Sequence, residues 1–566
     1  MRKQFLAALG SIGLGAVLSL YPTAQSQEAA VDGGNGAGIQ EGVEVLARGP
    51  VHEAFAEPSV RSPRPTPIVS KQPPDPVEEM PPDQKPEGAN VAWIPGYWVW
   101  DDDRKDFIWE SGIWRDIPPE RHWVAGYWNQ IEGGWQWVSG YWNIQAQETV
   151  DYLPAPPDPL PEAVSTAPEA ESIYVPGTWV WYQTRYMWRP GFWNRHRPGW
   201  VWAPAYYRWT PAGYVFVDGY WDYPFADRGL LFAPVFINQA YWGRPSWFYR
   251  PNFVVRDTFL LGSLFVRLDY SRYYFGDYFD AGYSRAGFIP WVDFRFGGTI
   301  PDPLFSYYRW QYASNPRWEA DMRQLYVARR TDPAARPPRT FAQITAAPAT
   351  ALAKPGTFAS IQTATPLTPL AKVAATGVKM QTVPKAQLTQ IRQAAVETHN
   401  FAKQRGQVEA KAISQGQGTP KAGQPLKLEL PKTGRPAVVQ TPGATEVKPK
   451  TPPPRPEHPK AEARPAPKTA PTSPYVPRPG SGQQVAPKVE PKIEPKVEPK
   501  VEPKREPKVE PKPAPKVEPK AEPKPAPRVE PKAEPKPPPP KVEPKPAPAP
   551  APAPREEKDK NKKEKG

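Results

Sequence analysis

The 566-residue sequence contains no cysteine, and this absence excludes disulfide bonds, thiolate metal sites and thiol catalysis together. Its five histidines, His52, His122, His196, His399 and His458, are scattered without the spacing of metal ligands. The G-x-S-x-G and H-E-x-x-H motifs and a phosphate-binding glycine loop are also missing. The paired carboxylates of a glycosidase need no fixed spacing, but nothing in the sequence points to them. We therefore expect a protein that is not an enzyme and holds neither cofactor nor metal.

Long apolar runs are rare as well. The run Phe5–Leu20 follows two basic residues and precedes the small residues of Ala24-Gln-Ser26. This order is typical of a secretory signal peptide over residues 1–26, cleaved before Gln27. The alternative is an uncleaved anchor helix, but the run is shorter than the ~20 residues that a membrane span needs. We predict a periplasmic or secreted protein of the cell envelope with no transmembrane span after signal cleavage.

Aromatic residues are scarce beyond Ala335, whereas all 23 tryptophans lie between Trp93 and Trp318. The C-terminal part is rich in proline, lysine and glutamate, a composition that buries too little apolar surface to offset chain entropy. We predict a disordered tail over residues 414–566, where Val-Glu-Pro-Lys repeats from Pro487 onward favour polyproline II. The formal net charge of +14 favours anionic partners. Because export is expected, we predict an envelope polysaccharide or an envelope protein as partner, and no nucleic acid.

What the sequence does contain is a repeated phrase, W-x-x-G-x-W. Trp123–Trp128 and Trp137–Trp142 state it most clearly, with their glycines fourteen positions apart, and looser copies bring the number to eight. This many copies at a nearly fixed period indicate a repeat architecture. The residues assigned to the structural repeat are Trp93, Gly96, Trp98, Trp109, Gly112, Trp114, Trp123, Gly126, Trp128, Trp137, Gly140, Trp142, Gly177, Trp179, Trp188, Gly191, Trp193, Gly219 and Trp221.

Each period suits one strand of ~9 residues and a turn of ~5. The two tryptophans of a phrase are five positions apart, which in an unbroken strand places them on opposite faces. A β-bulge with positive φ at the glycine would return both rings to one side. Two antiparallel arrangements stay open, a meander of kinked strands or two shorter strands per phrase. We predict a mainly β fold with two four-strand repeat blocks, residues 91–143 and 173–223.

The phrase resembles the WXXGXW repeat of bacterial proteins, also written YXWGXW. The likeness covers Trp93–Trp221, and Ala205 replaces the glycine in one copy. The resemblance implies export and a β-rich repeat, but it implies no activity and no functional residues. The tail is similar in kind to the spacers of TonB-type envelope proteins. No folded domain is expected after it, so the transducer function is not carried over.

The remaining segments are less regular. Asp302-Pro303 and Asn315-Pro316 each join an N-cap residue to a proline at the first helical position, so two helices are expected there. In the second helix Trp318, Met322 and Leu325 share one face, which should dock on the sheet. The expected order is a disordered leader (27–90), the first block, a Pro-rich linker (144–172), the second block, an aromatic-rich α+β accessory region (224–333), a linker (334–386), a marginal solvated helix (387–413) and the tail.

Two clusters of charge are candidate ligand sites. An acidic turn could hold calcium, but it does not fit the EF-hand pattern, so a solvated turn is favoured. In the second block, arginines lie among aromatic residues and could bind an anionic polymer, although stacking on ring faces is favoured. The acidic residues are Asp101, Asp102, Asp103 and Asp106, and the arginines are Arg185, Arg189, Arg195, Arg197 and Arg208.

Three hypotheses for function follow. The first is a non-enzymatic envelope scaffold, in which aromatic β-repeats hold the fold and the tail acts as a tether. The second is a polysaccharide-binding module that stacks sugars on exposed tryptophan and tyrosine rings. The third is an enzyme with a site hidden in residues 224–333. The exposure of the tryptophans separates the first two, because sugar stacking requires exposed rings.

Overall fold

The computed structural model describes residues 38–145, 149–296, 298–346, 357–414, 420, 424–429 and 450–457. All of them belong to one of the chain's two units, Met1–Val476. The expected signal peptide and most of the expected tail lie outside these residues. In the described part the fold is mainly β, and all ladders between named strands are antiparallel, which confirms the predicted fold class. None of the described helices combines the length and apolar character that a membrane span requires.

Each pair of W-x-x-G-x-W phrases forms one long hairpin that bends at its two glycine positions. The outer strands of a hairpin pair with each other, and so do the inner ones. The four bent hairpins are hairpin A (β5 Val91–Ile94, β6 Tyr97–Asp101, β7 Asp106–Glu110, β8 Ile113–Asp116), hairpin B (β9 Arg121–Val124, β10 Tyr127–Ile131, β11 Gly134–Val138, β12 Tyr141–Ile144), hairpin C (β14 Ser172–Val175, β15 Thr178–Tyr182, β16 Arg185–Arg189, β17 Phe192–Arg195) and hairpin D (β18 Val201–Ala203, β19 Tyr206–Thr210, β20 Gly213–Val217, β21 Tyr220–Asp222).

Of the two open arrangements, two shorter strands per phrase is therefore the one that forms, and each block of four strands becomes eight. The sequence accounts for the break at four of the eight slots. A proline precedes the slot at Pro95, Pro176, Pro190 and Pro204, and proline has no N–H to give to a ladder. The inner and outer strands belong to different small sheets in all four hairpins, including hairpin B, whose glycines follow Ala125 and Ser139.

The predicted bulge with positive φ is wrong. None of the repeat glycines has a positive φ, whereas Gly133 and Gly134 in the tip of hairpin B have φ values of 87° and 146°. The bend instead brings the first aromatic of one phrase opposite the second aromatic of its partner phrase. The strand ends at the glycine and a second strand follows, and in hairpin A the two resulting pairs, Trp93–Trp114 and Trp98–Trp109, belong to different core clusters.

Residues 38–90, predicted as part of a disordered leader, instead fold against the repeats. They form four short strands that add to sheet edges, and Ala47, Val51 and Ala54 are fully buried. Strands of two or three residues have no readable periodicity, which is why the composition was misleading. The strands are β1 (Val43–Val45), β2 (Gly49–Pro50), β3 (Ile68–Val69) and β4 (Gln84–Pro86), and they pair with β23, β26, β11 and β31.

The expected linker over residues 144–172 contains β13 (Thr149–Leu153), which lies between β20 and β32 (Leu426–Glu429) in one sheet. The accessory region mixes short strands and helices. It contains η1 (Phe225–Asp227), β22 (Gly229–Leu230), β23 (Val235–Ile237), α1 (Gln239–Trp242), β24 (Phe253–Val255), α2 (Asp257–Ser263), β25 (Leu264–Arg267), η2 (Leu268–Tyr270), β26 (Arg272–Phe275), α3 (Ala281–Arg285), β27 (Phe288–Pro290), β28 (Arg295–Phe296), β29 (Ile300–Pro301), α4 (Pro303–Gln311) and α5 (Trp318–Thr331).

The first expected helix starts at the predicted residue, and the second starts two residues later than predicted. The Asp302 carboxylate caps α4 by accepting the N–H of Leu304 at 2.8 Å. Helix α5 begins at Trp318, two residues after Pro316, while Asn315 accepts the N–H of Arg317. Trp318, Met322 and Leu325 are buried on one face of α5 and belong to the main core.

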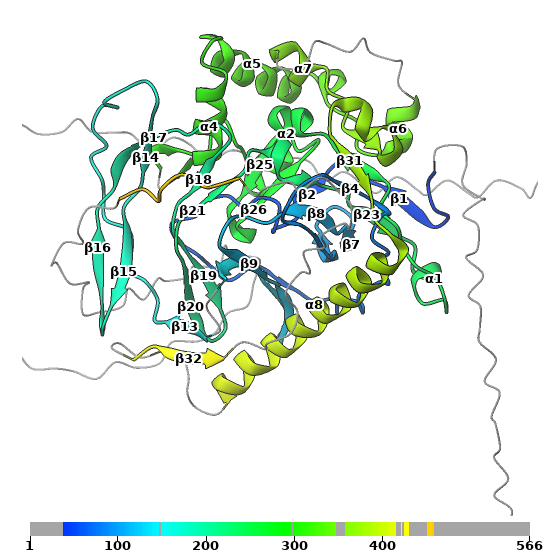
Figure 1. Cartoon of the computed structure of the whole chain (residues 1–566), viewed down its shortest axis with the longest axis horizontal. Coiled ribbons are helices and arrows are strands. Elements are labelled where there is room, and N and C mark those ends of the chain that lie inside the picture. Colours follow the sequence, from blue (N-terminus) through cyan, green and yellow to red (C-terminus); the bar gives the residue numbers. More distant parts are fainter. Residues whose placement is uncertain are drawn as a thin grey trace, which may run out of the picture. The chain divides into compact units, whose positions relative to one another are not determined.

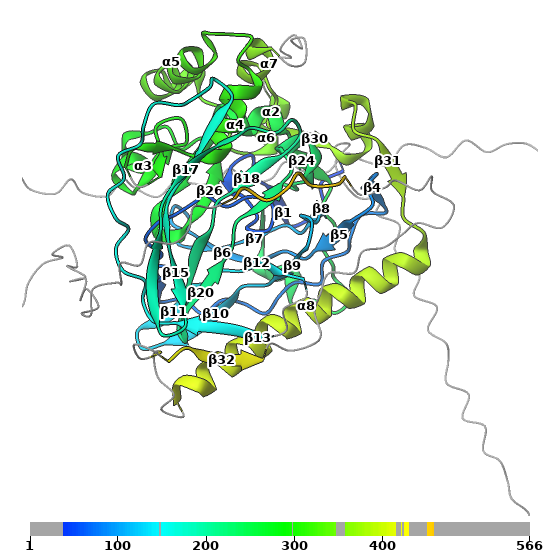
Figure 2. The same cartoon turned by 60° about the vertical axis from the view of Figure 1, so that its left-hand side comes forward.

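The segment expected to be a linker, residues 334–386, is ordered over its described residues. It forms η3 (Pro333–Ala335), α6 (Phe341–Ala346), α7 (Phe358–Gln362), β30 (Leu367–Pro369), η4 (Leu370–Thr376) and β31 (Met380–Thr382). Figures 1 and 2 show α2, α4, α5 and α7 gathered at one end of the strands, with the longest helix, α8 (Lys385–Ala412), at the other end.

Helix α8 is not the solvated helix that was expected over residues 387–413. It lies along hairpins A and B, and its Arg405 and Glu409 side chains are fully buried. Glu409 accepts the hydroxyls of Tyr127 at 2.6 Å and Tyr152 at 2.8 Å, while Arg405 donates to Glu409 and to the Ala125 carbonyl. A helix whose charged residues face inward gives a weak amphipathic pattern, so the sequence did not predict that α8 packs against the hairpins.

Candidate functional site

The tryptophans of the repeat are directed at one another. In each bent hairpin, two pairs of aromatic rings face each other across the ladder, with ring centroids 5.0–5.5 Å apart and planes at 51–79°. Such edge-to-face pairs stabilise a sheet beyond the area that they bury. The pairs are Trp93–Trp114, Trp98–Trp109, Trp123–Trp142, Trp128–Trp137, Tyr174–Trp193, Trp179–Trp188, Trp202–Trp221 and Tyr207–Phe216.

All 23 tryptophans lie among the described residues, and each is buried or half-buried. Fourteen are buried, and the other nine, which include Trp128, Trp181 and Trp193, are half-buried. Among the aromatic side chains of the described repeats, Tyr182 at the tip of hairpin C is exposed, with 56% of its surface accessible to solvent. The repeat therefore presents no row of exposed tryptophan rings.

A buried glutamate closes the bend of hairpin A. The Glu79 carboxylate accepts the N–H of Gly96 at 2.8 Å, the N–H of Gly112 at 2.8 Å and the indole N–H of Trp109 at 3.1 Å. The two glycine N–H groups face each other where the ladder breaks, so neither has a strand partner. Buried N–H groups require an acceptor, and the carboxylate supplies it. We call this arrangement a carboxylate clamp.

Hairpin C carries a clamp of the same kind, and hairpin B carries a partial one, in which the carboxylate binds one of the two glycines. In hairpin B, Glu53 accepts the N–H of Gly140 at 3.0 Å and the indole N–H of Trp137 at 2.8 Å. In hairpin C, one oxygen of Glu162 accepts the N–H groups of Gly177 and Gly191, both at 2.9 Å. Each of these two glutamates also pairs with an arginine, Glu53 with Arg272 at 2.5 Å and Glu162 with Arg61 at 3.0 Å.

The close approach of rings and other groups explains why the slot requires glycine. A Cβ on Gly112 would lie 2.4 Å from the Trp93 ring and 2.6 Å from a Glu79 oxygen, and a Cβ on Gly177 would lie 2.2 Å from a Glu162 oxygen. Contacts this short do not occur, so the glycine leaves room for both the ring and the carboxylate. The repeat glycines are therefore needed for close approach and not for their backbone angles.

Hairpin D departs from this pattern. Ala205 occupies one glycine slot, and the N–H of Gly219 is accepted by the neighbouring Asp218 at 2.9 Å. The Trp202 ring still lies over Gly219, where a Cβ would approach it to 2.4 Å. The ring packing is thus kept where the glutamate is not.

Burial and charge act differently on the clamps. Burial raises the pKa of Glu79 to about 7, although its three N–H donors oppose this change. For Glu53 burial also acts to raise the pKa, but the nearby charges of Arg272 and Arg208 outweigh it and hold the pKa at about 2. Glu53 is therefore a permanent anion in the core. Both glutamates come from the segment that was expected to be a leader.

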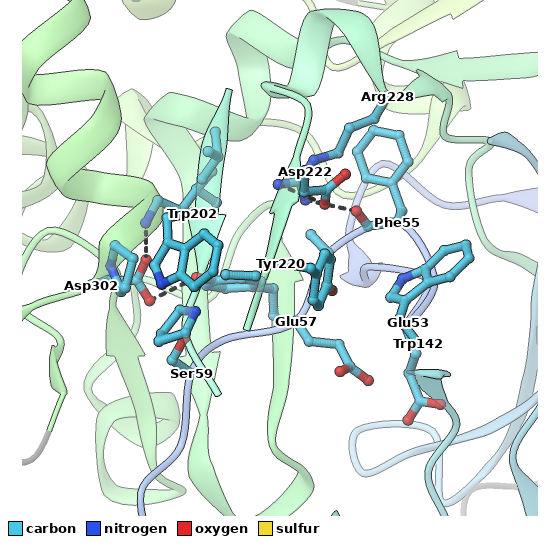
Figure 3. A pocket seen from close by; sticks show the side chains of 17 residues that line it. Glu53, Phe55, Glu57, Ser59, Trp142, Trp202, Tyr220, Asp222, Arg228 and Asp302 are labelled. Carbon is cyan, nitrogen blue, oxygen red and sulfur yellow. Dashed lines mark hydrogen bonds and ion pairs between the residues drawn. The ribbon is translucent and has the colours of Figure 1, made fainter. Parts of the chain in front are cut away.

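A small polar cavity of about 40 Å³ lies beside hairpin D, lined by Glu53, Glu57, Tyr220, Asp222 and Asp302 among others. Figure 3 shows Asp222, Glu57 and Asp302 apart from one another around Tyr220. Most of these carboxylates already have structural partners. Asp222 pairs with Arg115 and Arg228, while Asp302 caps α4 and accepts the hydroxyl of Tyr273.

The cavity of about 40 Å³ has room for a few water molecules. Glu57 pairs with Arg208 and accepts the hydroxyl of Tyr206, and its second oxygen is buried without a hydrogen bond. Burial raises the pKa of Glu57 to about 7, against the opposing charge of Arg208. The cavity is far smaller than the ~300–1,000 Å³ typical of sites for organic ligands, and most of its carboxylates are held by structural partners.

The acidic turn expected over Asp101–Asp106 is tied down by basic residues. Asp102 pairs with Arg267 at 2.6 Å, and Asp103 pairs with Arg48. Among the described residues, no group of three or more potential ligands could hold a metal ion. Of the arginines in the second block, Arg208 lies 5.1 Å from the Tyr206 ring centroid, while Arg189 and Arg195 pair with Asp218 and Glu169.

The structure brings together the expected repeat residues within each hairpin, but it adds three residues that the sequence reading missed: Glu53, Glu79 and Glu162. Two of them precede the first glycine that they bind by 17 and 15 residues, in Pro-rich stretches. A glutamate at that offset before each pair of phrases is the signal that could have found them. Glu53 lies 87 residues before Gly140 and has no such local signal.

Comparison with known proteins matches the chain to the model of the WXXGXW repeat (2 copies) over residues 88–115, 173–194 and 197–221. These ranges coincide with hairpins A, C and D, and hairpin B has the same geometry. No curated protein and no solved structure matches the chain.

Proposed function

We propose that this protein, which carries WXXGXW repeats in bent hairpins, is a non-enzymatic scaffold of the cell envelope. In this proposal the protein is exported, the repeats and the accessory region form a rigid unit, and the Pro-rich tail is a tether. The observation that carries the proposal is the use of the repeat rings. They pack on each other, and buried carboxylates at the bends bind backbone N–H groups, so the rings and glycines of the phrase serve the fold itself.

A module that recognises polysaccharide by stacking needs flat rings open to solvent. Tyr182 offers one such ring, beside the half-buried Trp181, and this is the feature on which the alternative of a polysaccharide-binding module rests. One ring at a hairpin tip gives little area for a specific polymer. We therefore propose an envelope protein, and not a polysaccharide, as the partner of the scaffold.

The proposal is tested with the full chain expressed with its own N-terminus. Cell fractionation should place the protein in the envelope fraction, and mass spectrometry should find the mature N-terminus near Gln27. Crosslinking in intact cells should capture an envelope protein, while a glycan array should give no specific signal. A protein with intact Met1 in the cytosol would overturn the proposal. A glycan signal that Tyr182→Ala abolishes would favour the alternative.

A further inference from the structure

A short Pro-rich segment from the C-terminal part of the chain lies on hairpin D. Residues 450–457 read Lys-Thr-Pro-Pro-Pro-Arg-Pro-Glu and form neither helix nor strand. They are orange in Figures 1 and 2, where they pass close to β18. Pro456 is buried, and Pro452 and Pro453 are half-buried, so the segment makes real contact with the folded unit.

The contact is anchored by a tryptophan. The indole N–H of Trp221 donates to the carbonyl of Pro454 at 3.2 Å. Trp221 itself is held in place by its edge-to-face pair with Trp202, so its N–H is fixed in direction. A run of prolines has no N–H groups and favours the polyproline II conformation, which leaves its carbonyls free to accept such a bond.

Charge complementarity fixes both ends of the segment. At one end, the Lys450 ammonium lies 2.8 Å from the Asp227 carboxylate and 5.6 Å from the centroid of the Tyr223 ring. At the other end, Arg455 pairs with Asp218. Exposed ion pairs of this kind contribute little singly. Together with the tryptophan bond, however, they define one register and one direction for the peptide.

This combination is a known way to recognise Pro-rich peptides, in which aromatic residues contact a preformed polyproline helix and acidic residues contact its basic ends. The Val-Glu-Pro-Lys repeats of the tail differ from this segment, because each carries a glutamate and spaces its lysines four positions apart, whereas Lys450 and Arg455 are five positions apart. The stretch Lys536–Lys541 reads Lys-Pro-Pro-Pro-Pro-Lys and shares the spacing of five.

We propose that the face of hairpin D formed by Asp218, Trp221, Tyr223 and Asp227 is a binding site for a Pro-rich peptide with a basic residue at each end, and that residues 450–457 of the same chain occupy it. The site fixes the point at which the tail leaves the folded unit. This inference goes beyond the scaffold proposal and does not depend on export or on the identity of the envelope partner.

The test uses the full chain and a fluorescein-labelled peptide of residues 450–457. In the wild-type protein the chain's own segment competes with the added peptide at an effective concentration on the order of 1 mM. The double variant Lys450→Glu/Arg455→Glu should release that segment while leaving the site intact. Fluorescence anisotropy should then show about 10-fold tighter binding of the peptide to the double variant than to the wild type.

Further substitutions in the double variant locate the site. Trp221→Phe keeps an aromatic ring but removes the indole N–H, and it should weaken peptide binding by at least about 5-fold. Asp227→Asn should weaken binding and reduce its dependence on salt. The matched control is Trp193→Phe, which removes an indole N–H that donates to Ser165, away from the peptide, and should leave binding unchanged.

A peptide of two Val-Glu-Pro-Lys repeats should not bind to any variant. The proposal is overturned if the wild type and the double variant bind the residue 450–457 peptide with equal affinity. It is also overturned if no variant binds this peptide at about 1 mM, which is the effective concentration given above. A third result that overturns it is an equal effect of Trp221→Phe and Trp193→Phe on peptide binding. Circular dichroism and thermal melting of each variant separate loss of the site from loss of the fold.

Discussion

Glu79→Gln is the sharpest perturbation of a carboxylate clamp, because it keeps the size of the side chain and removes one acceptor. Glu79 accepts the N–H of Gly96 on one oxygen, and the N–H of Gly112 and the indole N–H of Trp109 on the other. A glutamine has one oxygen and an amide NH₂, so at least one buried donor then faces another donor. Leaving one buried N–H donor without an acceptor costs about 1–3 kcal/mol. If the amide nitrogen instead takes the place of the oxygen that binds Gly112 and Trp109, two donors are left without an acceptor. We expect the free energy of unfolding to fall by about 2–4 kcal/mol.

The pH dependence gives this prediction a second readout. Because the pKa of Glu79 is raised to about 7 in the folded protein, the folded state binds a proton more tightly than the unfolded state between pH 4.5 and 7. Glu79 therefore stabilises the fold most at low pH, and this contribution is lost as the pH rises through 7. Glutamine cannot titrate, so the cost of Glu79→Gln should be smaller at pH 8 than at pH 5, by up to about 3 kcal/mol.

The assay is equilibrium unfolding in urea at pH 5 and pH 8, with hydrogen exchange of the Gly96 and Gly112 amides as a local readout. The matched control is Glu78→Gln at the neighbouring position. Glu78 is half exposed and pairs with Arg392, so its loss should cost less than about 1 kcal/mol. Equal unfolding curves for the two variants at pH 5, or unchanged exchange at the two glycines at that pH, would refute the clamp.

Three further perturbations test the remaining parts of the account. Gly126→Ala should cost more stability than Gly133→Ala, although of the two only Gly133 has a positive φ (87°). The reason is that a Cβ on Gly126 would lie 2.6 Å from a tryptophan ring and from a backbone carbonyl. Differential scanning calorimetry compares the two variants. Arg405→Met should destabilise the protein by about 3–5 kcal/mol in urea unfolding, since it leaves the Glu409 carboxylate buried without its cation; an effect below 1 kcal/mol would favour a solvated helix. Burial lowers the pKa of His52 to about 4, so the unfolded state binds the extra proton between pH 4 and 6.5. The wild type therefore loses stability as the pH falls through that window. In His52→Asn this loss of stability should be smaller by up to about 3 kcal/mol.

The sequence was sufficient for the features that depend on local pattern. The period of fourteen predicted antiparallel repeat strands, and Asp302-Pro303 predicted the start of α4, because both signals lie within one strand or one helical turn. The bend itself was ambiguous from spacing alone. A five-residue offset between rings fits either a bulge or a broken strand, and only the pairing of the outer strands decides between them.

Features that depend on distant contacts could not be predicted. Strands of two or three residues, such as β2, gain their stability from the sheet that they join and leave no periodic signal. Helix α8 buries Arg405 and Glu409, which any composition-based argument assigns to solvent. Glu53 acts 87 residues away from the glycine that it binds, so its role is a property of the fold and not of the surrounding sequence.

The central claim is that the repeat tryptophans build the fold and do not form a surface on which sugars stack. Its most direct test is acrylamide quenching of the intrinsic tryptophan fluorescence of the full chain, with and without envelope polysaccharide at saturating concentration. The account predicts weak quenching, a blue-shifted emission maximum, and no change in either when the polysaccharide is added, because no tryptophan is exposed. A saturable spectral shift, or protection from acrylamide by the polysaccharide, would contradict it.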